Sequence, residues 1–423
     1  MTTRGPGSSL ARRLTTPDAV ILGVGSMVGA GLFSAFAPAA RSAGGWLLAA
    51  LGVAAVVAFC NAASSAQLAA QYPTSGGTYV YGRERLGPWW GFVAGWGFVI
   101  GKTASCAAMA LVVAAYLVPQ PWQKPVGVAV VAALAAVNYR GITRTARLTR
   151  IIVASVLAAL AVVLVAVSVL GHEPGAGTPP TAEMVTHLGA GGVLQGAAIL
   201  FFAFAGYARI ATLGEEVVDP ARTIPRAVLG AFAIVLPLYA VTAVVLVRAL
   251  GTEGLAASTA PLRDAAGTVP SAGWLTVVVG AAATAATLGA LLALIAGVGR
   301  TALAMAREGD LPRPLAAVHE RYAVPHVAEV VLAVLVCLLV VLTDLRGAIG
   351  FSSFGVLTYY AVANASALTQ DRAHRRYPRV VAVAGLLGCV VLALAVPVAS
   401  LLAGLVVLAV GLLGRAVVQH RRG

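Results

Sequence analysis

The stretch GVGSMVGAGLF at residues 23–33 lies inside an apolar segment long enough to cross a membrane, and it contains Gly23, Gly25, Gly29 and Gly31. Each glycine in a helix interior costs up to about 1 kcal/mol relative to alanine, so this segment is expected to be interrupted. In a bilayer, non-helical backbone persists only where it is buried in protein or lines a wet cavity. The N–H and C=O groups freed at such a break can hold a small polar solute, which indicates a transporter.

A second interpretation of these glycines is close packing. Gly25 and Gly29 have the spacing of the GxxxG motif, which lets membrane helices approach each other. A second interruption favours binding, because paired broken helices in matching halves of a chain are typical of inverted-repeat transporters with a site at the midplane. The sequence FFAFAGY at residues 201–207 provides this second interruption. It lies in the first helix of a second set of five helices.

The composition of the chain is that of a membrane protein. Its 423 residues are 60% hydrophobic and 10% charged, with a mean hydropathy of +0.91. A soluble domain of this size needs more charge. The net charge of +14 does not indicate a nucleic-acid partner, because the basic residues fall between apolar spans rather than in one soluble domain. No removable signal peptide is expected at the N-terminus.

Apolar runs predict twelve helices and an orientation. The segments are 18–40, 44–70, 89–117, 125–140, 150–171, 189–212, 227–249, 274–300, 327–344, 347–369, 379–396 and 399–416. With both termini cytoplasmic, the inner segments carry 22 of the 29 basic residues and the outer segments carry five, as the positive-inside rule requires. The predicted units are a cytoplasmic tail (1–17), a first repeat (18–171), a second repeat (189–369), two further helices (379–416) and a cytoplasmic tail (417–423).

Residues that would support catalysis, metal binding or ATP hydrolysis are scarce. The four cysteines lie far apart within apolar spans and form no CxxC pair, and the histidines fall mostly in predicted loops. There is no GxxxxGK[ST] sequence for ATP. We therefore expect no metal, no cofactor and no enzymatic activity.

Four motifs in order resemble the amino acid–polyamine–organocation (APC) superfamily, and the exit of the sixth predicted helix is especially similar to its cationic amino acid transporter branch. That exit is the segment GEEVVDPARTIPR, which follows the second interruption. The motifs occupy residues 23–33, 72–79, 202–226 and 299–312. The resemblance covers residues 18 to about 370. It implies an all-α polytopic protein with a LeuT-type 5+5 inverted repeat, in which helices 1 and 6 are broken.

The resemblance also implies substrate-binding positions. Amides around Gly29, Ala30 and Gly31 would bind the carboxylate of an amino acid, because the N-terminal end of a half-helix attracts anions. Carbonyls near Met27, and those of helix 6, would bind its amino group. The helix 6 positions counted with the site are Phe202, Ala203, Ala205 and Tyr207.

Several positions depart from the family pattern. Where relatives often carry an acid after the Gly-aromatic pair, this chain has Ala208 and then Arg209. Lys102 is a lone cation in the third predicted helix (89–117). Three roles are considered for it: a proton-coupling group, a fixed charge that selects anionic side chains or supports the site, and a structural lysine. Helix 5 has no lysine, and its polar candidate is Ser155.

Two roles are considered for Arg209. It could form a structural ion pair or a cytoplasmic gate with Glu215 and Glu216, or it could contact the substrate.

These observations predict a secondary active transporter of an amino acid, coupled to protons or to a counter-substrate, in a cell membrane and most simply a bacterial one. Sodium coupling is less favoured. By analogy with relatives, helix 8 would supply hydroxyl ligands for sodium at Gly289-Ala290, which have no hydroxyl groups, although Thr284 and Thr287 lie nearby. The alternatives are a transporter of a polyamine or other organic amine, and a nutrient sensor that keeps the fold without flux.

Overall fold

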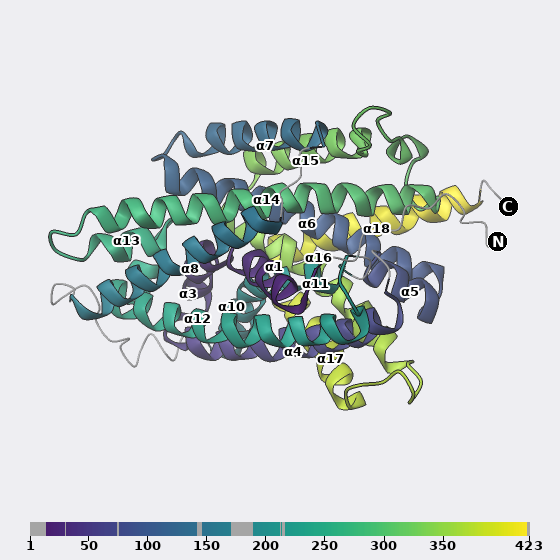
Figure 1. The fold of residues 1–423 in the computed structure, drawn as a ribbon, viewed down its shortest axis with the longest axis horizontal. Helices are drawn as coiled ribbons and strands as arrows, with labels where there is room; N and C mark the ends of the chain where they lie inside the picture. The colour runs from purple at the N-terminus through teal and green to yellow at the C-terminus, as the bar shows by residue number, and fades with distance from the viewer. Residues whose placement is uncertain are drawn as a thin grey trace.

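A computed structural model describes residues 14–29, 31–73, 76–141, 146–170, 189–211, 213 and 216–420 of the chain. Within these ranges the fold is all-helical and contains no strand, apart from one isolated bridge between Leu14 and Val217 (Figure 1). The helices are α1 (Thr16–Val28), α2 (Gly31–Ser34), α3 (Phe36–Ala43), α4 (Leu47–Gln71), α5 (Thr78–Leu86), α6 (Pro88–Leu117), α7 (Gln123–Tyr139), α8 (Ala146–Val169), α10 (Gly189–Phe204), α11 (Ala208–Ala211), α12 (Pro220–Ala257), α13 (Pro261–Gly267), α14 (Trp274–Arg307), α15 (His326–Leu342), α16 (Leu345–Leu368), α17 (Arg379–Ala395) and α18 (Val398–His420). Three 3₁₀ turns join them: η1 (Gly44–Trp46), η2 (Ala205–Tyr207) and η3 (Arg313–Ala316).

Each of the twelve expected segments coincides with a helix or with a broken helix. Eight helical stretches in the described ranges are long and apolar enough to cross a membrane, and α15 and α17 are shorter apolar helices. The sequence underestimated α12, which was expected at 227–249 but begins at Pro220, where a proline at the first helical position loses no hydrogen bond. It also gave no sign of α5 and α13, which are too short to produce an apolar run.

The broken helices lie in the middle of the bundle. In Figure 1 the long helices α14, α12 and α4 run lengthwise, and α1, α10, α11 and α16 lie between them. The α5 helix and the C-terminal end of α18 lie at one end of the long axis, and α13 lies at the other. The interruptions are therefore enclosed by continuous helices on several sides.

Small residues let α6 and α16 cross at close range. A Cβ added to Gly355 would lie 2.7 Å from the Cα of Gly101, and one added to Gly97 would lie 2.9 Å from the carbonyl oxygen of Gly355. In lipid there is no hydrophobic driving force that brings helices together. Their association therefore depends on close van der Waals packing of this kind. The crossing places Ser105 against Ser352, whose hydroxyl oxygens lie 2.6 Å apart, and it fixes the neighbouring Lys102.

Candidate functional site

Both expected interruptions are present. The first helix ends at Val28 and resumes at Gly31, and Gly29 has the non-helical angles φ −38° and ψ −91°. The second changes from α10 to the 3₁₀ turn η2 at Ala205 and continues as α11 from Ala208. Changing the helix type releases backbone groups from their regular partners. The two interruptions therefore let backbone groups in the interior bond to partners outside their own helix.

The two interruptions pack directly against each other. A Cβ added to Gly206 would lie 2.6 Å from the amide nitrogen of Met27 and would also meet the carbonyl of Ser26. A Cβ added to Gly31 would lie 2.6 Å from the Cβ of Ala203 and would also meet its Cα. Glycine is thus required at both positions because backbone passes where a side chain would begin.

The other glycines of the first interruption have packing partners as well. A Cβ at Gly25 would lie 2.6 Å from the side chain of Val153, and one at Gly29 would lie 2.6 Å from the Cβ of Ala290. Gly23 faces Ile210 in the same way. Packing therefore accounts for these glycines, and their number alone does not identify a ligand site.

Protein donors already reach the carbonyl groups of both interruptions. The hydroxyl of Tyr239, on α12, lies 2.7 Å from the carbonyl oxygen of Met27 and 3.0 Å from that of Ala203, so it bridges the two breaks. The ammonium group of Lys102 donates to the carbonyl of Ala205 at 3.2 Å. Thr287 donates to the carbonyl of Gly29 at 3.1 Å. These are the carbonyl groups at which a ligand with an ammonium group would have to compete.

A cavity of about 480 Å³ borders the interruptions. Its wall includes Met27, Gly31, Phe202, Ala205 and Gly206 from the two broken helices. The charged residues on the wall are Lys102 of α6, Arg209 of α11, Glu216 of the segment before α12, and Arg300 of α14. Backbone from both breaks and charged side chains from around them therefore meet at one space large enough for a small solute.

Some of the expected site residues lie elsewhere. Ala203 and Tyr207 are buried behind the cavity wall, and the ring of Tyr207 stacks on that of Tyr360 with centroids 4.9 Å apart. The amide of Gly29 donates to the carbonyl of Gly25 at 3.2 Å, so it is already engaged within the first helix. Ala30 and Glu215 lie outside the described residues.

Ser155 lies away from the interior in this structure. Its side chain is exposed on α8, whereas Thr149, Ile152, Val153 and Val156 of the same helix line an interior cavity. At about 100° per residue, Ser155 lies about 110° from the mean direction of these four side chains. Its role as a coupling or selectivity group stays a prediction.

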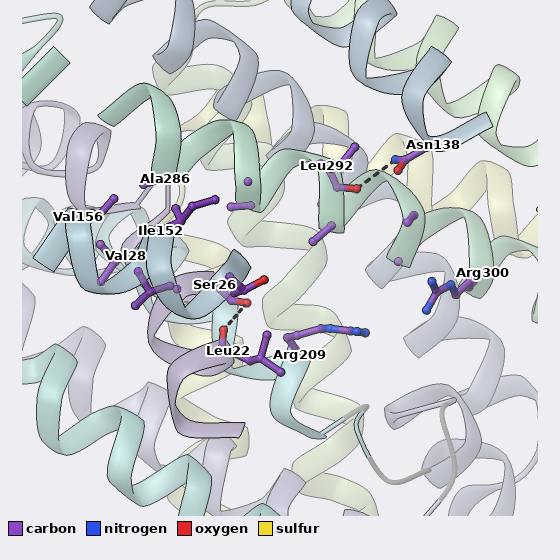
Figure 2. Close-up of a pocket in the computed structure, with 18 residues that line it drawn as sticks. Leu22, Ser26, Val28, Asn138, Ile152, Val156, Arg209, Ala286, Leu292 and Arg300 are labelled. Atoms are coloured by element: carbon purple, nitrogen blue, oxygen red, sulfur yellow. Dashed lines mark hydrogen bonds between the residues drawn. The ribbon is translucent and has the colours of Figure 1, made fainter. Parts of the chain in front are cut away.

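A second, smaller cavity of about 180 Å³ lies between α1, α8 and α14 (Figure 2). Its wall is largely apolar, and two of its polar members donate to backbone carbonyl groups: Ser26 to that of Leu22 at 2.8 Å and Asn138 to that of Leu292 at 3.0 Å. Figure 2 shows the side chains of Arg209 and Arg300 extending toward the same region. Both arginines also border the larger cavity, so they connect the two spaces.

Arg209 forms an ion pair with Glu216 at 3.6 Å. The helix that carries Arg209 ends at Ala211, five positions before Glu216. This pair joins the second interruption to the segment that leads into α12. Both side chains remain partly exposed to the cavity.

A buried ion network lies at the end of the molecule that contains α5. The carboxylate of Asp310 pairs with Arg83 at 3.0 Å and with Arg415 at 3.1 Å, and it accepts a hydrogen bond from Tyr79 at 2.8 Å. Burial, and then this hydrogen bond, raise the pKa of the Tyr79 phenol, so the group stays neutral and donates. Because Tyr79 also borders the larger cavity, the network connects its wall to α18.

Sequence reasoning missed Tyr239 and Arg300, and it named Thr287 only as a neighbour of the possible sodium region. Tyr239 is the one whose signal was available, since a tyrosine in the middle of an apolar helix needs a partner for its hydroxyl when it is buried. Its partner could not be named, because Met27 is 212 positions away in the chain.

A family model described as amino acid permease matches residues 14–416, which includes both interruptions and the whole helical bundle. The chain belongs to this amino acid permease family, within the APC superfamily.

The relatives are named as transporters. An uncharacterised transporter of Mycobacterium tuberculosis is 58% identical over 402 residues, covering 95% of this chain and 90% of its own length. A chloroplastic cationic amino acid transporter of Arabidopsis thaliana is 29% identical, covering 85% of this chain and 66% of its own length. A branched-chain amino acid permease of Bacillus subtilis is 26% identical, covering 88% and 83%. This membrane protein is therefore similar along most of its length to amino acid transporters of different named specificity.

Removing the Tyr239 hydroxyl should loosen the contact between the two interruptions of this permease. Tyr239→Phe is expected to lower the free energy of unfolding by about 1–2 kcal/mol, because two buried carbonyl groups lose the one O–H donor that they share. Thermal unfolding of the detergent-purified protein measures this loss. Tyr322→Phe is the matched control, since that hydroxyl makes no hydrogen bond within the described part of the chain. Equal stability of the two variants would contradict a bridging role.

Proposed function

We propose that this protein is a secondary active transporter that moves an amino acid across the cell membrane by alternating access. The observation that carries this proposal is the cavity of about 480 Å³, whose wall contains backbone from both broken helices. Half-helix ends offer partial charges that match the two ends of a zwitterion. Membership of the amino acid permease family supports an amino acid as the substrate.

The proposed architecture is a LeuT-type 5+5 inverted repeat with twelve membrane crossings. The first repeat runs from α1 to α8 and the second from α10 to α16, and α17 and α18 follow. The position of each interruption in the first helix of its set supports this division. The excess of basic residues on the inner segments supports cytoplasmic termini in a bacterial plasma membrane.

The proposed coupling is proton symport or exchange. Lys102 and Arg209 are the candidate coupling groups, because both border the larger cavity. The ion pair between Arg209 and Glu216 is the proposed cytoplasmic gate, since it ties the second interruption to the segment before α12. Opening this gate would require the pair to separate.

Uptake of labelled amino acids into proteoliposomes tests the proposal. A mixed panel is offered with and without an imposed pH gradient, and in a separate series with amino acid preloaded inside. Uptake stimulated by inward acidity is expected for a symporter, and uptake that requires preloading is expected for an exchanger. If no amino acid enters under either condition, the transport function is refuted, and a sensor that binds without flux becomes the better description.

A polyamine transporter is the second candidate, and the cavity argues against it. Three cationic side chains, Lys102, Arg209 and Arg300, border the space, against the single carboxylate of Glu216 among the described wall residues. A polycation would be repelled by such a wall. Including a labelled polyamine in the same uptake panel tests this directly.

A further inference from the structure

We propose that the substrate of this cavity carries a net negative charge, as an amino acid with a second carboxylate does, and that Lys102 selects it. This inference rests on the proposed function, because it names the charge class of the transported amino acid. It is carried by the partners of Lys102, by the donors already present at the broken helices and by the balance of charge on the cavity wall.

The ammonium group of Lys102 has bonding capacity to spare. It sits in the interior with 7% of the residue exposed, and it borders the cavity. An ammonium has three N–H donors, and the hydrogen bond to the carbonyl of Ala205 uses one of them. No carboxylate in the described ranges forms an ion pair with it. A buried cation without an acid partner is costly, and an anionic ligand in the cavity would remove that cost.

The acceptors that a substrate cation would need are partly occupied. The carbonyl groups of Met27 and Ala203 face the Tyr239 hydroxyl, and that of Ala205 accepts from Lys102. Lys102 therefore already provides a positive charge where the second interruption offers a carbonyl. A second cation from the substrate side chain would add repulsion at this point, whereas a carboxylate would gain a charged partner.

The remaining wall charges have the same sign. Arg209 and Arg300 border the cavity, and Glu216 is the one carboxylate among the described wall residues. Even with Glu216 paired to Arg209 at 3.6 Å, the charges on this part of the wall sum to a positive value. In a space of low dielectric such a wall concentrates anions and excludes cations. The charges on the wall and the donors at the broken helices therefore favour the same class of substrate.

Binding and uptake with a charge-matched panel test the inference. The purified full-length protein is challenged with L-glutamate, L-aspartate, L-glutamine, L-lysine and glutarate, and ligand-induced thermal stabilisation is read beside proteoliposome uptake. Glutamine has nearly the shape of glutamate without its second charge. Glutamate is expected to bind at least about tenfold tighter than glutamine. A tenfold difference in Kd corresponds to the free energy of about one hydrogen bond to a charged group.

The chain provides a matched pair of lysine variants, because Lys102 and Lys124 are its only two lysines. Lys102→Met is expected to reduce the preference for glutamate over glutamine to about threefold or less, since the charged hydrogen bond is lost. Lys102→Arg is expected to keep it and shows whether a cation at this position suffices. Lys124→Met is the control, as Lys124 is outside the cavity wall and donates to the carbonyl of Val341 at 2.6 Å.

The panel separates failure of this inference from failure of the proposed function. Binding and uptake of glutamine or lysine in preference to both acidic amino acids would overturn the inference and leave amino acid transport standing. Binding of glutarate with no uptake of any amino acid would support an anionic substrate and overturn amino acid transport. An unchanged preference for glutamate in a folded Lys102→Met variant would overturn the role of Lys102, and binding of no member of the panel would overturn the inference as a whole.

Discussion

Gly206→Ala is expected to abolish transport, with uptake reduced more than about tenfold, because overpacking of a close contact costs about 1–3 kcal/mol or more. The added methyl group would lie 2.6 Å from the amide nitrogen of Met27 and 2.5 Å from the carbonyl carbon of Ser26. Both are backbone atoms, so no flexible side chain can move aside. The two broken helices must then separate, and the cavity wall that they share is lost.

The control for this prediction is Gly52→Ala in α4. A Cβ at Gly52 meets no atom within 4 Å, so uptake should remain at the level of the unmodified protein. Size-exclusion chromatography and thermal unfolding of both variants show whether a loss of uptake reflects loss of the fold. Normal uptake by Gly206→Ala would mean that the contact between the interruptions is not needed for transport.

Asp310→Asn is expected to cause the largest loss of stability, about 3–5 kcal/mol, because removing one partner of a buried ion pair leaves an uncompensated charge. Asp310 has a side-chain exposure of 4% and Arg415 one of 3%, so water cannot replace the lost interaction. Arg415 keeps its hydrogen bond to the carbonyl of Pro88 and its position over the rings of Trp89 and Phe92. These contacts hold the guanidinium in place and prevent it from escaping to solvent.

Thermal unfolding in detergent measures this effect, and a fall in Tm on the order of 5 °C or more is expected. Glu308→Gln is the matched control, since Glu308 pairs with Arg83 at 3.1 Å but is 54% exposed, and exposed pairs contribute at most about 1 kcal/mol. Adding Arg415→Met to Asp310→Asn should recover part of the loss, because both charges are then gone. Equal stability of the Asp310 and Glu308 variants would show that the network is not a structural tie.

The interruptions were predictable from the sequence because their signal is local. Clustered glycines in an apolar segment and the Ala-Gly-Tyr turn at residues 205–207 indicate a break without knowledge of any other helix. The twelve apolar segments were predictable for the same reason, since hydropathy depends only on neighbouring residues. What these signals do not contain is the rotation of each helix about its own axis.

That missing rotation explains why the exposed position of Ser155 could not be predicted. Because α8 is apolar on most of its surface, the sequence offers no contrast between an inner and an outer face, and a lone serine fits either. The long-range partners were equally hidden. Tyr239 and Met27, or Asp310 and Arg83, are more than 200 positions apart, and nothing in their own surroundings shows that they meet.

The glycine crossing of α6 and α16 has a mechanical consequence for Lys102. The lysine follows directly after Gly101, so its backbone lies at a close backbone-to-backbone contact between two continuous helices. Its acceptor, the carbonyl of Ala205, belongs instead to a 3₁₀ turn within an interrupted helix. The hydrogen bond between them thus joins a continuous helix to an interrupted one. In the proposed transport cycle, a displacement of the turn would lengthen this bond and free the ammonium to bind an oxygen of the substrate.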